Sequence, residues 1–182
     1  MSFKSNEAGY GGVAKTIHWF SAVCILLLLG SGFKAGSAVD SVEKIEILKF
    51  HIPLGLMMLF LTVFRIIWWW CFDTKPASSE SNPSWQDFSA KAVHLLFYVI
   101  IIGMAASGIG MLVLSGAGLL IFSGANGILP DFHLYPPRLP HGVGARVLVF
   151  LFVLHAGAAL YHHFIKRDQT LKRMWFGYGE KI

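Results

Sequence analysis

Four stretches of about 20 apolar residues dominate this sequence and constrain its fold more than any other feature. They cover residues 14–33, 50–72, 92–115 and 143–165, and each holds few charged side chains. A helix of about 20 apolar residues crosses the hydrocarbon core of a bilayer and satisfies its own backbone hydrogen bonds there. The sequence therefore predicts an all-α fold, a transmembrane four-helix bundle.

The composition agrees with this interpretation. Hydrophobic residues make up 55% of the 182 residues and charged residues 14%, against about 45–50% and about 25% in a soluble domain. The segments between the runs are mixed and charged at 36–49, rich in Ser, Pro and acid at 73–91, and rich in Gly and Pro at 116–140. We expect residues 1–182 to form a single integral membrane domain, with the apolar part of 116–140 in the membrane interface.

The net charge of +5 is a signal of membrane topology. A basic balance can indicate nucleic-acid binding, but here most of the basic residues flank the apolar runs, and no nucleic-acid partner is expected. If the N-terminus lies inside, ten of the 15 Lys and Arg residues fall on the inner side, which is the bias of cytoplasmic segments. The sequence therefore predicts that both termini are cytoplasmic.

The chain contains eight histidines, and all of them except His133 lie in or at the ends of the apolar runs. Apart from His163, the neighbour of His162, these are His18, His51, His94, His141, His155 and His162. Ionisable rings are costly in lipid and therefore indicate function. Zinc would require three or four ligands at one site, whereas these rings divide between two depths. The two cysteines make neither a thiol metal site nor a disulfide framework.

The fourth run carries the most informative spacing. His141 and His155 are 14 residues apart, which corresponds to about 21 Å of helical rise and leaves both rings within about 40° of one face. This gap suits two haems stacked across a membrane. An iron held by two axial rings from different helices has no open position for a substrate, so the arrangement favours pure electron transfer.

The partners of these two rings follow from their depths. His51 opens the second run from outside and is the natural outer partner of His141. His18 is the natural inner partner of His155, with His94 as a competitor. A simple count places His155 about 10 Å deeper in the bilayer than His18. No Cys-x-x-Cys-His motif occurs, so any haem would be bound without a covalent link.

Two further residues of the inner side are candidates for binding. His162 follows His155 by seven residues on the same face, about 10 Å nearer the cytoplasm, where its ring could exchange a proton with a quinone carbonyl. Arg65, near the inner end of the second run, either reaches to the interface or pairs with a haem propionate. No residue is assigned a catalytic role, and His133 and His163 have no predicted one.

Four segments resemble the prokaryotic cytochrome b561 family, the four-helix di-haem b proteins of the bacterial inner membrane. They are KTIHWFSA, KFHIPLGLMMLFLTVFRIIW, AVHLLFYVIIIGMAASG and HGVGARVLVFLFVLHAGAALYHHFIKRDQTLKRM, and the last is the most specific. The resemblance covers nearly the whole chain. It implies two non-covalent haems b with His51 paired with His141 and His18 paired with His155 as axial ligands.

The resemblance also implies a function. One member type, superoxide oxidase, oxidises superoxide outside and reduces ubiquinone inside, and its quinone-contacting histidines match His94 and His162. We therefore expect an oxidoreductase that passes electrons from a periplasmic donor, superoxide or a redox protein, to ubiquinone or another quinone. The alternative is a haem-bearing membrane anchor for a separate redox enzyme. An ion transporter is disfavoured because no Asp or Glu lies within the four runs.

Overall fold

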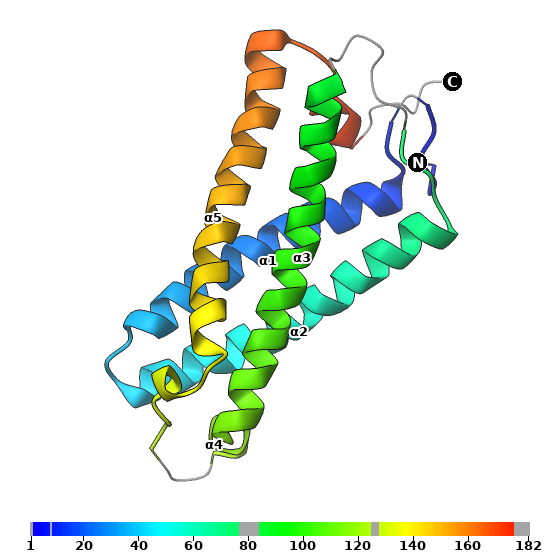
Figure 1. The fold of residues 1–182 in the computed structure, drawn as a ribbon. Coiled ribbons are helices and arrows are strands. Elements are labelled where there is room, and N and C mark those ends of the chain that lie inside the picture. The colour runs from blue at the N-terminus through cyan, green and yellow to red at the C-terminus, as the bar shows by residue number, and fades with distance from the viewer. Residues whose placement is uncertain (1, 8, 77–83, 125–127, 177–182) are drawn as a thin grey trace. The chain divides into compact units, whose positions relative to one another are not determined.

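The computed structural model describes residues 2–7, 9–76, 84–124 and 128–176, and every regular element in these ranges is helical (Figure 1). The four long helices are α1 (Gly12–Ser37), α2 (Ser41–Cys71), α3 (Ser84–Ser115) and α5 (Arg138–Tyr161). The short elements are α4 (Ala117–Ser123), the 3-10 helices η1 (Phe132–Leu134) and η3 (Lys172–Met174), and the π-helix η2 (His162–Lys166). The prediction of an all-α fold is confirmed.

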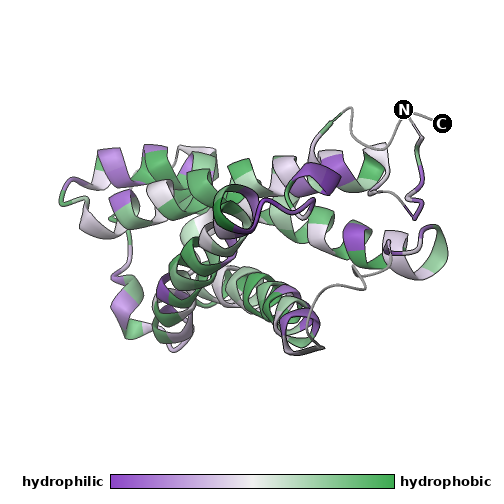
Figure 2. Cartoon of the chain, turned by 90° about the horizontal axis from the view of Figure 1, so that it is seen from above, coloured by the Kyte–Doolittle hydropathy of each residue, from purple (hydrophilic) through white to green (hydrophobic). Residues whose placement is uncertain are grey.

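The four long helices are long and apolar enough to cross a membrane. Figure 2 shows that hydrophobic residues extend along most of each of them. Large apolar side chains such as Phe60, Val113 and Phe150 are 64–71% exposed on these helices. A soluble protein would not expose so much apolar surface, and the chain is therefore a multi-pass membrane protein whose helices contact lipid.

The helices extend beyond the apolar runs of the sequence. Helix α2 begins at Ser41 instead of residue 50, because the Asp40 carboxylate accepts hydrogen bonds from the backbone N–H groups of Val42 and Glu43 at 3.3 and 3.1 Å. Such a cap satisfies the orphan donors of the first turn. Hydropathy detects only the portion of a helix that faces lipid, so it predicts a linker where the polar first turns of α2 lie.

The chain divides into two compact units, and each long helix contributes to both. The terminal unit comprises Met1–Ala22, Leu61–Tyr98 and Phe150–Ile182, and the central unit comprises Val23–Phe60 and Val99–Val149. Each unit holds one of the predicted histidine pairs. The single-domain organisation of the whole chain stays a prediction.

In the terminal unit, Asp73 ties the N-terminal segment to the end of α2. Its carboxylate accepts hydrogen bonds from the Ser5 backbone N–H at 2.9 Å, the Ser5 hydroxyl at 2.8 Å and the Trp68 indole N–H at 3.1 Å. The indole N–H of Trp19 donates to the Met174 carbonyl at 3.0 Å, which attaches the C-terminal segment to α1. Side chains therefore hold both terminal segments against the helices of this unit.

In the central unit, the segment after α3 folds onto the helices. Gly116 and Gly124 flank α4 with φ angles of 65° and 68°, a left-handed conformation that glycine adopts without strain. Ala117 and Ile121 of α4 are fully buried. The apolar part of the predicted 116–140 linker thus contains a short packed helix, whose burial the composition alone does not reveal.

Candidate functional site

The central unit brings His51 of α2 and His141 of α5 together. Their ring centres are 6.3 Å apart, with an angle of 67° between the ring planes. An imidazole nitrogen binds a first-row metal at about 2.0 Å, so two rings on opposite sides of one ion have centres about 6 Å apart. The space between these two rings therefore fits one axially ligated metal.

A hydrogen bond donated to Ser31 of α1 orients the His51 ring. The Ser31 hydroxyl donates to the Leu27 carbonyl at 2.7 Å and lies 2.9 Å from Nδ1 of His51. Because its single hydrogen is used on the carbonyl, the hydroxyl accepts from a protonated Nδ1. Nε2 of His51 is then unprotonated and able to bind a metal.

His141 is oriented in the same way from α3. Its Nδ1 lies 3.0 Å from the Ser107 hydroxyl and 3.1 Å from the Met104 carbonyl, while the same hydroxyl donates to that carbonyl at 3.0 Å. A carbonyl only accepts, so Nδ1 of His141 carries the proton and Nε2 is again free for a metal. His141 thus has two acceptors where His51 has one hydroxyl.

Two glycines leave room beside these rings. A Cβ on Gly32 would lie 3.1 Å from Cε1 of His51, and a Cβ on Gly108 would lie 3.4 Å from Cε1 of His141. Both rings line a cavity of about 450 Å³, mostly apolar, which His133 also lines. The donor nitrogens, the glycine clearance and the apolar cavity together fit a flat macrocycle such as haem.

The terminal unit brings His18 of α1 and His155 of α5 together. Their ring centres are 6.0 Å apart and their planes make an angle of 62°. This separation also fits one metal between two imidazoles. Aromatic side chains surround the pair, since Trp19 lies 5.6 Å from the His18 ring and Phe97 lies 5.6 Å from the His155 ring.

A third histidine lies beside this pair. The His94 ring is 5.4 Å from the His155 ring, and its Nδ1 donates to the Ala90 carbonyl at 2.7 Å. Nε2 of His94 is therefore unprotonated. The structure places both sequence candidates, His18 and His94, next to His155.

His162 begins the π-helix η2 and is held from the following turn. Its Nδ1 forms a hydrogen bond with the Asp168 carboxylate, whose other oxygen accepts from the Thr170 backbone N–H at 2.9 Å. Burial raises the pKa of Asp168, but the hydrogen bonds from His162 and Thr170 outweigh it, and the pKa lies below its ordinary value. The ionised carboxylate therefore fixes the orientation of the His162 ring.

Arg65 of α2 lies over the Tyr98 ring of α3, with its guanidinium carbon 5.9 Å from the ring centre. Such a contact holds an arginine inside an aromatic environment by cation–π attraction. Its predicted contact with a propionate stays a prediction.

Sequence reasoning missed three residues that hold the histidines, namely Ser31, Ser107 and Asp168. A signal for the first two exists, because a Ser-Gly dipeptide occurs inside the first and third apolar runs, at 31–32 and 107–108. In each case the serine hydroxyl and the glycine clearance serve the same histidine ring. Asp168 gave no comparable signal, because its contact depends on the turn after the π-helix.

Comparisons with known proteins agree with this geometry. The sequence profile of the family described as prokaryotic cytochrome b561 matches residues 9–177. Cytochrome b561 homolog 2 of Escherichia coli is 27% identical over 184 residues, covering 96% of this chain and 95% of the relative. Cytochrome b561 homolog 1 of the same organism is 26% identical over 87% of this chain and 92% of the relative.

A third relative carries a functional name. The probable superoxide oxidase CybB of Yersinia pestis is 27% identical over 161 residues, covering 87% of this chain and 90% of the relative. The profile match extends over nearly the whole chain and includes all four long helices. The chain therefore belongs to the prokaryotic cytochrome b561 family, which makes it a bacterial multi-pass membrane protein with b-type haem that transfers electrons across the membrane.

Proposed function

We propose that this protein transfers electrons through two b haems, from a donor on the periplasmic side to the membrane quinone pool. In this proposal His51 and His141 are the axial ligands of one haem, and His18 and His155 are those of the other. The observation that carries it is the ring separation of the two pairs, 6.3 and 6.0 Å, because each leaves room for one iron between two imidazoles.

Each bound haem supplies a centre that accepts and releases one electron. The protein contributes the orientation of the ligands and a surrounding of low polarity. Ser31 and Ser107 hold Nδ1 of the central pair, which fixes the tautomer and raises the basicity of the ligand nitrogen. An iron held by two imidazoles of the protein would have no position left for a substrate, so the chemistry that it would supply is electron transfer.

For the quinone end we propose His94 and His162 as the residues that exchange protons with a quinone carbonyl. His94 lies next to His155, so a quinone bound at its ring would be close to the pair in the terminal unit. The Asp168 carboxylate accepts a hydrogen bond from Nδ1 of His162 and fixes the direction of the ring. A ring that can hold a proton beside an electron donor suits the two-proton reduction of a quinone.

Superoxide is the donor that we favour. Lys44, Arg138 and Arg146 line the same cavity as His51 and His141, and basic side chains around a cleft attract a small anion. The relative named probable superoxide oxidase points in the same direction. The proposal places this cavity on the periplasmic side and both termini in the cytoplasm.

The ligand assignment is tested by haem quantitation and reduced-minus-oxidised spectra of purified single variants. We expect about two haems per chain in the wild type and about one in His51→Ala and His141→Ala, with the second spectrum intact. His18→Ala and His155→Ala should disturb the other haem. Two intact haems in His141→Ala would refute the pairing.

The same measurement decides between His18 and His94. We expect His94→Ala to keep both haems and to slow quinone reduction. Loss of a haem from His94→Ala with retention in His18→Ala would exchange the two roles.

A measurement of quinone reduction by the isolated protein distinguishes an enzyme from a haem-bearing membrane anchor. We expect the isolated protein in liposomes to reduce ubiquinone when superoxide is generated outside. Intact haems without this activity would favour a haem-bearing subunit for a separate redox enzyme.

A further inference from the structure

A second cavity lies wholly in the terminal unit, where α5 continues into η2 and the chain turns back through η3. Its volume is about 540 Å³, which is in the range of ligand-binding pockets. The apolar side chains that line it come from the end of α5, from η2 and from the segment around η3. They are Leu160, Phe164, Leu171, Trp175 and Phe176.

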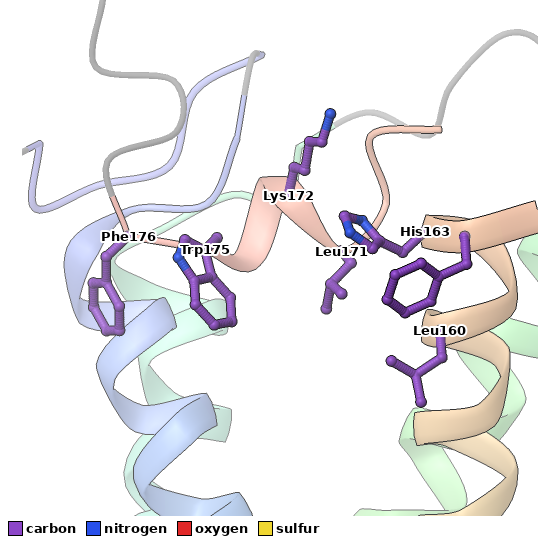
Figure 3. A pocket seen from close by; sticks show the side chains of 7 residues that line it. Leu160, His163, Leu171, Lys172, Trp175 and Phe176 are labelled. Atoms are coloured by element: carbon purple, nitrogen blue, oxygen red, sulfur yellow. The ribbon is translucent and has the colours of Figure 1, made fainter. Parts of the chain in front are cut away.

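The cavity has an apolar side and a charged rim. Figure 3 shows Leu171, Trp175 and Phe176 extending from the η3 segment toward the helices, whereas Lys172 points to the opposite side. Lys172 makes no ion pair with any residue that the structure describes. A ligand that matches this arrangement is apolar in its body and anionic at one end.

His163 also lines the cavity, but its Nδ1 atom does not open into it. This atom is buried and makes no hydrogen bond within the described ranges. It therefore offers a ligand no polar contact, and recognition rests on the apolar lining and on Lys172.

The surrounding segment is strongly basic. Lys166, Arg167, Lys172 and Arg173 fall within eight residues of sequence, and the one acid among them, Asp168, is hydrogen-bonded to His162. This segment directly follows a membrane-spanning helix. Basic clusters at such positions attract anionic lipid headgroups.

We propose that this cavity binds an anionic glycerophospholipid. One acyl chain occupies the apolar lining, and the phosphate lies beside Lys172. The argument uses only the terminal unit and the position of the cavity at the end of a spanning helix. It is independent of the haem ligands and of the side of the membrane.

Native mass spectrometry of the haem-loaded full chain tests the proposal. The protein in detergent is mixed with equal amounts of phosphatidylglycerol and phosphatidylcholine that carry identical acyl chains. We expect the wild type to retain one phosphatidylglycerol with a preference of about fivefold, as one lysine near a phosphate provides. Lys172→Gln should abolish the preference.

Two further variants separate a cavity from a charged surface. Lys166→Gln removes the same charge from the same segment but does not line the cavity, so it should keep the preference. Leu160→Trp fills the cavity and should release both lipids, while unchanged haem absorbance shows that the variant is folded. Equal retention of both lipids by the wild type, an equal loss in both lysine variants, or a retained quinone in place of the lipid would overturn the proposal.

Discussion

The His51/His141 pair of the central unit and the His18/His155 pair of the terminal unit have nearly the same ring separation, 6.3 and 6.0 Å. They differ in what holds the rings. Hydrogen bonds that the rings donate to serine hydroxyls orient the first pair, and two glycines leave space beside it. Aromatic rings pack around the second pair, together with a third histidine.

The two pairs therefore show two different ways of orienting an imidazole that binds a metal. A hydrogen bond sets both the direction and the tautomer of an imidazole, whereas packing restricts its position and leaves the choice of proton to the surroundings. The central pair should therefore respond to the loss of single polar atoms or to added volume. The terminal pair should respond to cavities and to changes at its neighbouring histidine.

The largest effect is expected from adding volume beside the central pair. Gly32→Leu would place a side chain against the His51 ring, where even a Cβ would lie at 3.1 Å. We expect haem content to fall from about two to about one per chain, with the terminal pair unaffected. Gly30→Leu is the matched control, because nothing lies within 4 Å of a Cβ at Gly30. A loss of haem in both variants would mean that helix packing is the cause.

The next effect concerns the serine hydroxyls. Ser31→Ala removes the hydroxyl that holds Nδ1 of His51, and losing such an outer-shell contact lowers metal affinity by about 10- to 100-fold. Ser107→Ala should have a smaller effect, because the Met104 carbonyl still accepts from His141. The haem affinity of both alanine variants is measured by how much haem each retains when a competing apoprotein is added. Ser31→Thr should restore the wild-type affinity. Equal losses in the two alanine variants would contradict the assigned acceptors.

Packing at the terminal pair provides the converse test. Phe97→Ala opens space beside the His155 ring, and removing a partly buried phenylalanine costs about 2–3 kcal/mol. We expect the thermal midpoint of the terminal-pair haem spectrum to fall by several degrees while the central-pair spectrum is unchanged. Phe60→Ala, at a side chain that is 70% exposed, is the control for general loss of apolar surface. A fall in both spectra would remove the distinction between the pairs.

The smallest effect belongs to Asp168. Its pKa is lowered in the folded protein because the hydrogen bonds from His162 and Thr170 outweigh the effect of burial, so its stabilising contribution is present above the unfolded pKa of about 3.9. That contribution is lost as the pH falls through the lower folded value. We expect Asp168→Asn to reduce stability by less than about 1 kcal/mol at pH 7.

The difference between wild type and Asp168→Asn should shrink as the pH falls. Thermal melts at pH 7 and at a series of lower pH values measure it, and the two proteins should have equal haem content at each pH. Slower quinone reduction in Asp168→Asn at full haem content would show that the carboxylate positions His162. A stability difference between the two proteins that grows as the pH falls would contradict the lowered pKa of Asp168 in the folded protein.

Much of the architecture follows from hydropathy, because four apolar runs can satisfy their backbone in lipid only as helices. The ends of the helices do not follow from hydropathy, because Asp40, which caps the start of α2, lies outside the apolar runs. The histidine pairs could be proposed because 14 residues return to nearly the same helix face. The choice between His18 and His94 could not, because both rings lie within 6.0 Å of the His155 ring and depth counting is too coarse to rank them.

The contact between the Trp19 indole and the Met174 carbonyl joins residues separated by 155 positions. During synthesis at about 5–20 residues per second, the acceptor emerges about 8 to 30 seconds after the donor. Throughout that interval the first helix is already made, but its indole has no final partner. A nascent chain released before residue 174 would therefore keep this donor without its final partner, and its C-terminal segment could not attach to α1 through this contact.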